Sequence, residues 1–135
     1  MLKKAALILV ASMGILSLAH AQSNVDTLPS GVRVEHTVKG NGPTPTVDST
    51  VTVNYRGTFA SNGAEFDSSY KRGKPTSFPL GGVIPCWRDG IQKMAVGGKA
   101  VLLCPSSTAY GARGAGGVIP PNADLRFEVE LLDVK

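Results

Sequence analysis

Residues able to carry covalent, metal or nucleotide chemistry are scarce in this chain of 135 residues. It contains 2 His and 2 Cys, and His20 lies in an N-terminal segment that we expect to be removed. A Ser-His-Asp or Cys-His apparatus would therefore depend on His36, which lies in a predicted strand and is expected to be a packed or surface residue. The remaining His and the two Cys are too few for a closed tetrahedral zinc site, and no GxxxxGK phosphate loop occurs. Catalysis by a nucleophile, a metal or a cofactor is disfavoured.

Aromatic side chains are the more informative group. The chain has 4 Phe, 3 Tyr and 1 Trp, and five of these rings lie in separate predicted elements: Tyr55, Phe66, Trp87, Tyr110 and Phe127. Rings distributed in this way line a concave binding pocket or fill an ordinary core. Their spacing alone leaves both possibilities open.

The elements that must position these rings are short strands separated by turns. Residues 50–59 alternate between apolar and polar types, which places Val51, Val53 and Tyr55 on one face. Residues 125–131 alternate in the same way. Shorter strands are expected around 32–38, 66, 76–80 and 99–104.

One segment has helical character. Pro85 suits the first turn of a helix, and Trp87, Ile91 and Met94 fall on one helical face. Gly97-Gly98 is expected to end the segment. Together these elements predict an α+β fold, in which a mostly antiparallel sheet has one polar face and a short helix covers the apolar face.

Residues 1–21 are typical of a secretory signal peptide, because a basic start and an apolar run precede the small-x-small pattern Ala19-His20-Ala21. We expect cleavage after Ala21 and a periplasmic or secreted protein without stable membrane association; an uncleaved anchor is the alternative. Residues 22–30 are expected to be a flexible lead-in, and residues 31–135 a single domain.

Charge does not indicate a nucleic-acid partner. Removal of Lys3 and Lys4 lowers the formal net charge from +4 by two, to +2. The remaining basic residues are scattered, whereas nucleic-acid-binding proteins gather them in a patch. The densest group, Lys71-Arg72 with Lys74, is expected to be a solvated loop.

Six motifs follow one another along the chain: Val53-Asn54-Tyr55-Arg56-Gly57, Phe66-Asp67-Ser68-Ser69, Val83-Ile84-Pro85-Cys86-Trp87, Ala109-Tyr110-Gly111, Val118-Ile119-Pro120-Pro121-Asn122-Ala123 and Leu125-Arg126-Phe127-Glu128-Val129-Glu130-Leu131. In order and spacing they resemble the FKBP-type peptidyl-prolyl cis-trans isomerases, from about Gly31 to Val134. The resemblance implies an FKBP-like half-barrel: an antiparallel sheet of five or six strands wrapped around one short helix, with a pocket between them.

The resemblance also implies roles for the pocket rings. Trp87 is expected to form the floor under the substrate proline ring. Tyr55, Phe66 and Phe127 are expected to be the walls that receive the substrate carbonyl, and the hydroxyl of Tyr110 should donate to a substrate carbonyl.

Three aliphatic residues complete the implied pocket. Val83 and Ile84 are expected to line its mouth, where the Ile84 backbone N–H donates to the substrate chain, and Ile119 is expected to close the side formed by a loop. The residues expected to be catalytic are Asp67, Tyr110, Phe127 and Trp87; the others bind substrate.

Asp67 is the one carboxylate implied in the pocket, and Arg72 matches a family position beside it. The carboxylate either polarises the pocket edge and orients Tyr55, Arg72 or the substrate, or forms a structural ion pair with Arg72. It is not expected to be an obligatory acid or base, because rotation about an amide bond moves no proton.

Three positions depart from the commoner family pattern. Cys86 stands where Gly is usual, Thr76 where many members have an aromatic, and Ala115 where some have a bulkier residue. Thr76 and Ala115 are expected to make the rim of the pocket smaller and its binding weaker or broader, which bears on macrolide affinity more than on isomerase activity. Two Cys in an exported chain favour a disulfide, and Cys86 and Cys104 lie on elements that pack together in the implied fold; two buried, unpaired thiols are the alternative.

The predicted function is isomerisation of Xaa-Pro bonds in exported proteins, with proline-containing polypeptides as partners and macrolide inhibitors as potential ligands. A pocket that excludes water would favour the twisted, less dipolar amide, so no cofactor is required. A non-catalytic chaperone of the same fold that holds unfolded chains is the main alternative, and a structural or adhesive β-domain is a more distant one. A monomer is expected.

Overall fold

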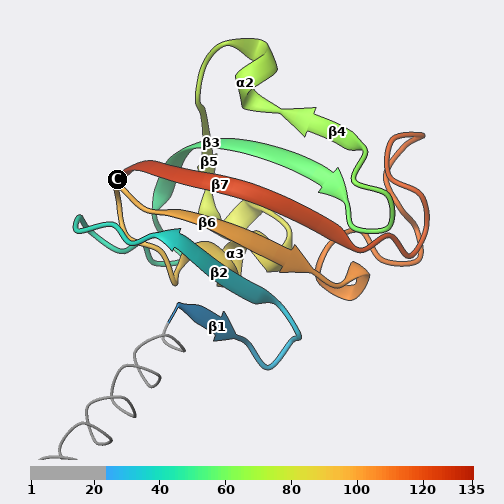
Figure 1. The fold of residues 1–135 in the computed structure, drawn as a ribbon, viewed down its shortest axis with the longest axis horizontal. Coiled ribbons are helices and arrows are strands. Elements are labelled where there is room, and N and C mark those ends of the chain that lie inside the picture. The colour runs from blue at the N-terminus through green and yellow to red at the C-terminus, as the bar shows by residue number, and fades with distance from the viewer. Residues whose placement is uncertain (1–23) are drawn as a thin grey trace, which may run out of the picture.

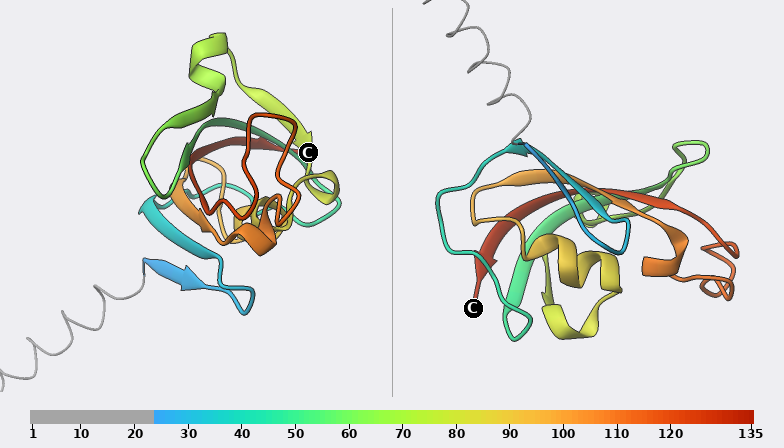
Figure 2. Two further views of the ribbon diagram at one scale, coloured as in Figure 1. Left: turned by 90° about the vertical axis from the view of Figure 1, so that its right-hand side faces the viewer. Right: turned by 90° about the horizontal axis from the view of Figure 1, so that it is seen from below.

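The computed structural model describes residues 24–135, which form one curved antiparallel sheet. Its strands are β1 (Val25–Thr27), β2 (Arg33–Val38), β3 (Thr50–Phe59), β4 (Glu65–Ser68), β5 (Thr76–Pro79), β6 (Lys99–Cys104) and β7 (Leu125–Val134). Their spatial order is β1-β2-β6-β7-β3-β4, and β5 also pairs with β3. The concave side of the sheet curves around the helix α3 (Pro85–Ile91), as Figures 1 and 2 show. The expected half-barrel around one main helix is confirmed.

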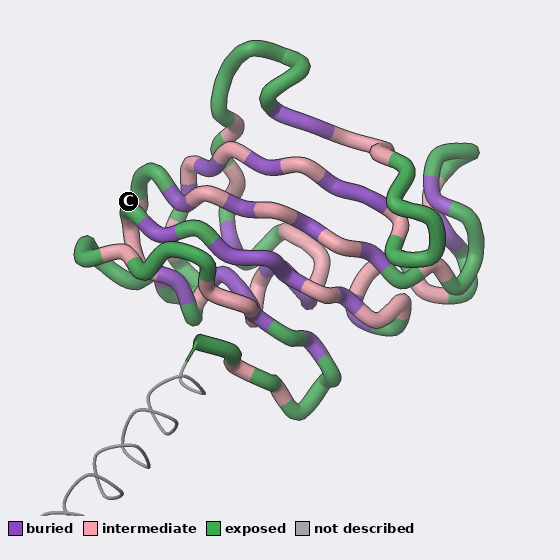
Figure 3. The backbone as a smooth tube through the Cα atoms, in the orientation of Figure 1, coloured by how far each residue is buried: buried purple, intermediate pink, exposed green. Residues whose placement is uncertain are grey.

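The two longest strands, β3 and β7, pair along their full lengths in the middle of the sheet. On β3 the buried side chains of Val51, Val53 and Tyr55 alternate with half-buried polar residues. On β7 the same alternation buries Leu125 and Phe127, and Figure 3 shows it as alternating colour along both strands. The predicted period of two is confirmed, and it sends one row of side chains from each strand toward α3.

Helix α3 packs closely against β6. Pro85 occupies its first turn, as predicted, and an added Cβ at Gly90 would lie 3.3 Å from Cδ2 of Leu102. The predicted helix end at Gly97-Gly98 was wrong, because the helix ends at Ile91. Turn hydrogen bonds replace helical ones there, and the N–H of Met94 donates to the Ile91 carbonyl at 3.0 Å. The side chain of Met94 is still buried.

Strand β1 lies in the segment predicted to be a flexible lead-in, and it raises the strand count to seven where five or six were expected. It pairs with β2, so that Val25 lies opposite Glu35. His36 Nε2 lies 2.8 Å from Asp26 Oδ2 across this pair. The predicted packed or surface histidine is therefore confirmed, and the contact helps to explain why so short a strand pairs here.

A one-turn helix, α2 (Ser69–Arg72), covers part of the segment that the sequence predicted to be a solvated loop. The Ser68 hydroxyl accepts a hydrogen bond from the Lys71 N–H at its N-terminus, and Gly73 takes a left-handed φ of 75° at its C-terminus. Both are common helix-end features. Four residues are too few for periodicity to reveal a helix, which is why the pattern missed it.

The predicted disulfide is present. Cys86 and Cys104 are bonded, with their Cα atoms 5.6 Å apart, and both are buried. The bond joins the first turn of α3 to the last residue of β6, and the alternative of two unpaired thiols was wrong.

The predicted signal peptide, residues 1–21, lies outside the described residues. Within residues 24–135, no helix has the length and apolar character needed to cross a membrane.

Candidate active site

The indole of Trp87 forms the floor of a cavity on the concave side of the sheet. Trp87 lies in the first turn of α3 and is 4% exposed. Three rings meet it nearly at right angles, with centroids 5.0 Å away at Tyr55, 5.2 Å at Phe78 and 5.3 Å at Phe127. Such edge-to-face contacts are favourable between aromatic rings. Trp87 Nε1 is buried and has no hydrogen-bond partner among residues 24–135.

Phe66 is a wall of the cavity because of a β-bulge. In the pairing of β3 with β4, Gly57 lies opposite Asp67 and Thr58 opposite Glu65, so Phe66 is the extra residue. A bulge bends a strand and redirects its side chains. The Phe66 ring meets that of Phe127 with centroids 5.7 Å apart and an interplanar angle of 82°.

The cavity enclosed in this way has a volume of about 340 Å³, which is within the range of small-molecule sites. Besides the five rings named above, it is lined by Asp67, Gly82, Val83, Ile84 and Tyr110. Its lining is thus mainly apolar, with a single carboxylate at one edge.

One side of the cavity offers hydrogen-bonding groups to a guest. Ile84 lies between the 3₁₀ helix η1 (Leu80–Gly82) and α3, and its carbonyl accepts from the N–H groups of Trp87 and Arg88. The Ile84 N–H itself has no acceptor within the described part of the chain. Tyr110 follows the 3₁₀ helix η2 (Ser106–Thr108) and is 41% exposed, so its hydroxyl is accessible beside the cavity.

The polar edge of the cavity is a hydrogen-bonded cluster around Asp67. The Tyr55 hydroxyl donates to Asp67 Oδ2 at 2.5 Å. Arg72 donates from Nη1 to Asp67 Oδ1 at 2.7 Å and from Nη2 to the Tyr55 hydroxyl at 3.0 Å. Arg72 Nη2 also lies 3.3 Å from Thr76 Oγ1, and its Cζ atom lies 5.6 Å from the centre of the Tyr55 ring.

This cluster fixes the charge state of its members at neutral pH. Burial acts to raise the pKa of Asp67, but the hydrogen bonds from Tyr55 and Arg72 outweigh it and hold the pKa below the ordinary value of 3.8. Burial, with the hydrogen bond to Asp67, raises the pKa of Tyr55 above 10.0. The cluster therefore contains a carboxylate, a guanidinium and a neutral phenol.

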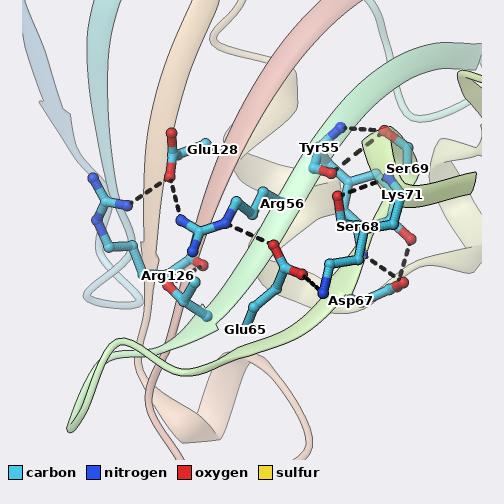
Figure 4. A network of polar contacts seen from close by, with 10 residues as sticks. Tyr55, Arg56, Glu65, Asp67, Ser68, Ser69, Lys71, Arg126 and Glu128 are labelled. Atoms are coloured by element: carbon cyan, nitrogen blue, oxygen red, sulfur yellow. Dashed lines mark hydrogen bonds and ion pairs between the residues drawn. The ribbon is translucent and has the colours of Figure 1, made fainter. Parts of the chain in front are cut away.

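A second polar network holds β4 against the centre of the sheet (Figure 4). The Glu65 carboxylate forms ion pairs with Arg56 Nε at 2.7 Å and with Lys71 Nζ at 2.5 Å. The Glu128 carboxylate forms ion pairs with Arg56 Nη1 at 3.2 Å and with Arg126 Nη1 at 3.1 Å. Single exposed pairs contribute little stability, but this chain of pairs links β7, β3, β4 and α2. It therefore supports the strand that carries two of the cavity residues.

Comparison with known proteins identifies the family. A family model described as FKBP-type peptidyl-prolyl cis-trans isomerase matches residues 42–132. The chain belongs to this family. It is 47% identical over 114 residues to FkpA of Escherichia coli K12, covering 84% of this chain and 42% of FkpA. It is 51% identical over 107 residues to FK506-binding protein 1 of Dictyostelium discoideum, covering 78% of this chain and 99% of that protein.

Solved FKBP-type structures have the same fold. The crystal structure of Escherichia coli FkpA gives a TM-score of 0.79 at 42% identity, covering 98% of this chain and 62% of that one. A peptidyl-prolyl cis-trans isomerase of Pseudomonas syringae gives 0.77 at 36% identity, covering 93% and 91%. The chain spans less than half the length of the FkpA protein. It covers nearly all of the Dictyostelium protein and of the Pseudomonas structure.

The FKBP fold brings together most of the residues that the sequence predicted for the site. The cavity is lined by all five predicted rings, Tyr55, Phe66, Trp87, Tyr110 and Phe127, and by the predicted Asp67, Val83 and Ile84. Arg72 does not line the cavity, but it donates hydrogen bonds to Asp67 and Tyr55, which do. Ile119 lines an adjoining cavity of about 380 Å³, which shares Phe66, Asp67 and Tyr110 with the first.

Two lining residues, Phe78 and Gly82, were missed. Phe78 and Thr76 are both half-buried on β5, separated by the exposed Ser77. Since Thr76 and Phe78 lie on the same face of β5, and the family resemblance placed Thr76 at the pocket rim, the period of two was a signal that Phe78 could supply a ring there. No comparable signal marks Gly82.

Proposed function

We propose that this FKBP-type chain is a peptidyl-prolyl cis-trans isomerase that acts on Xaa-Pro bonds of unfolded or folding polypeptides. The observation that carries the proposal is the cavity floored by Trp87 and walled by Tyr55, Phe66, Phe78 and Phe127. A proline ring is a compact apolar group that such a cavity can hold while the rest of the peptide stays outside.

The chemistry asked of the site is rotation about one amide bond. The barrier in water is roughly 18–20 kcal/mol, because rotation breaks amide resonance. The twisted amide is less dipolar than either planar form, so water stabilises the planar forms more. A site that excludes water removes part of that preference. A reduction of about 5 kcal/mol in the barrier corresponds to a rate increase on the order of 10³- to 10⁴-fold.

The polar groups beside the cavity would orient the peptide. The Ile84 N–H is a donor without a protein acceptor in residues 24–135, so it is available to a substrate carbonyl. The Tyr110 hydroxyl is a second accessible donor on another loop. Two donors from different loops would hold the chain on either side of the bond while the proline ring rests on Trp87, which favours rotation over simple binding.

Asp67 would act through its charge and its partners. Its carboxylate is ionised at neutral pH and is hydrogen-bonded to Tyr55 and Arg72. The ion pair with Arg72 and the place in the cavity lining coexist in the structure, so both roles considered for Asp67 remain compatible with it. Because no bond to hydrogen forms or breaks in the reaction, Asp67 polarises and orients rather than transfers a proton.

A proline-limited refolding reaction tests the isomerase against the alternative of a chaperone that only holds unfolded chains. An isomerase accelerates the slow phase at substoichiometric concentration, whereas a holding chaperone suppresses aggregation and needs stoichiometric amounts. Competition by the macrolide tacrolimus would place the activity in the cavity. Absence of acceleration at any concentration would refute the proposal.

We further propose that the protein is exported to the periplasm or secreted as a monomer. Export is supported by the signal-like residues 1–21 and by the disulfide, since disulfides persist mainly in oxidising compartments. N-terminal sequencing of the mature protein should give Gln22 as the first residue. Sedimentation of the mature protein should give the mass of one chain.

A further inference from the structure

The alternation of buried and half-buried residues along β3 predicts a buried side chain at position 57, but the residue there is Gly57. It lies inside the ten-residue strand β3 and is buried. It continues the row of Val51, Val53 and Tyr55 on the concave face. Glycine inside a strand costs conformational entropy and packs nothing. Its φ is not in the left-handed region, so the backbone conformation here does not require glycine.

The space around Gly57 does require it. An added Cβ would lie 2.6 Å from Phe66 Cζ and 2.9 Å from Phe127 Cε1, whereas non-bonded carbon atoms rest about 3.5–4.0 Å apart. Gly57 is also the cross-strand partner of Phe127 on β7 and of Asp67 on β4. The volume left by its missing side chain is thus filled by two rings of the cavity wall.

We propose that Gly57 is a positioning residue of the isomerase pocket: its missing side chain is the space in which the rings of Phe66 and Phe127 meet edge to face. The kinetic part of this inference rests on the proposed isomerase function. Phe127 is 4% exposed and is held by Trp87. Phe66 is half-buried on a bulged edge strand, so Phe66 is the ring that a methyl group at residue 57 would displace.

Gly57→Ala tests the proposal, with Gly42→Ala as a matched control. At Gly42 an added Cβ would lie 2.7 Å from Cβ of Val96, which is a similar overlap outside the cavity. Where urea titration shows both variants folded, we expect Gly57→Ala to lower kcat/KM on a short Xaa-Pro peptide by about tenfold or more, since small misplacements at a reacting centre are costly. Gly42→Ala should keep the wild-type kcat/KM. Equal kinetics in the two variants would overturn the proposal.

Repeating the Gly57→Ala change in a Phe66→Leu protein shows whether the Phe66 ring carries the loss of kcat/KM. Leucine lacks the Phe66 Cζ and Cε atoms that a methyl group at residue 57 would contact, so only the overlap with Phe127 Cε1 remains. In a Phe66→Leu protein the added Gly57→Ala change should therefore lower kcat/KM by clearly less than it does in the parent background. A loss as large as in the parent background would refute the role of the ring. If Gly57→Ala alone does not fold, folding of Gly57→Ala/Phe66→Leu supports the proposal, and failure of both refutes it.

Spectroscopy separates this inference from the proposed activity. A wild-type protein that does not accelerate isomerisation would refute the function but not the packing at Gly57. The near-ultraviolet circular dichroism of the packed rings should change in Gly57→Ala and stay unchanged in Gly42→Ala whether or not the protein is an isomerase. Identical near-ultraviolet spectra for wild type and Gly57→Ala would refute the positioning role.

Discussion

The indole of Trp87 meets the ring of Phe127 edge to face, with centroids 5.3 Å apart and an interplanar angle of 84°. The first residue comes from helix α3 and the second from the central strand β7, so this contact joins the helix to the sheet at the cavity. Trp87 is the only Trp of the chain. Tryptophan fluorescence therefore has a single source, which lies at the floor of the pocket.

Replacement of Phe127 by Ser should remove most of the isomerase activity. The change deletes a wall ring that contacts both Trp87 and Phe66, and it admits water where the mechanism needs a dry surface. We expect kcat/KM to fall on the order of a hundredfold and the Trp87 emission to shift to longer wavelength.

Leu125→Ala is the control for Phe127→Ser. Leu125 is 1% exposed on the same strand and does not line the cavity, so its truncation costs roughly 2–5 kcal/mol of stability without altering the wall. Proline-limited refolding of a test protein gives the comparison. A Phe127→Ser protein that matches its parent in this assay would disprove the account of the pocket.

Asp67→Ala should keep measurable activity, because the reaction moves no proton. The loss should come from disorder of Tyr55 and Arg72, which both bond to the carboxylate. Asp67→Asn, which keeps the shape of the side chain, should lose less. Peptide kinetics on the two variants give the ranking, and complete inactivity of Asp67→Asn would restore an acid–base role.

The pH dependence follows from the same cluster. Although burial raises the pKa of Asp67, its hydrogen bonds hold it below 3.8 in the folded protein. A group with a lowered folded pKa contributes stability that is present above the unfolded value and is lost as the pH falls through the folded value. The unfolding free energy of the wild type should therefore decline below about pH 4 relative to that of Asp67→Asn. An equal decline in both proteins would contradict this.

The kinetic profile should be flat across the neutral range. Burial and the bond to Asp67 keep the Tyr55 pKa above 10.0, and Asp67 stays ionised, so neither group changes charge between about pH 5 and pH 9. A bell-shaped profile of kcat/KM within that interval would indicate a titrating group that the site as described does not contain.

The strands were predictable because β3 and β7 have one buried face each, so Tyr55 and Phe127 fell into a clear period of two. The start of α3 was predictable from Pro85. Its end was not, because Met94 stays buried in a turn after the helix has finished. Strand β1 was missed since three residues carry no period; it pairs with β2 through the backbone, and His36 contacts Asp26 across the two strands.

Site residues could be predicted from the sequence only where their type is rare in this chain. The scarce aromatics made the rings conspicuous, but assigning Trp87 to the floor and Asp67 to the edge depended on the resemblance to a family. Gly57 shows the limit of the pattern. The sequence does not indicate why a strand contains glycine at this position. The reason appears only in three dimensions, where the rings of Phe66 and Phe127 occupy the space of its side chain.

The disulfide between Cys86 and Cys104 should stabilise the protein without being needed for chemistry. The bond closes a loop across a sequence separation of 18 residues, for which loop entropy predicts about 3 kcal/mol. The double variant Cys86→Ala/Cys104→Ala should lose stability of that order in urea and should show no response to a dithiol reductant. The wild type should move toward the variant when reduced, and slowly, because both sulfurs are buried. Alkylation of the unreduced, denatured wild type should attach no label, whereas two labels per chain would show that the bond is absent.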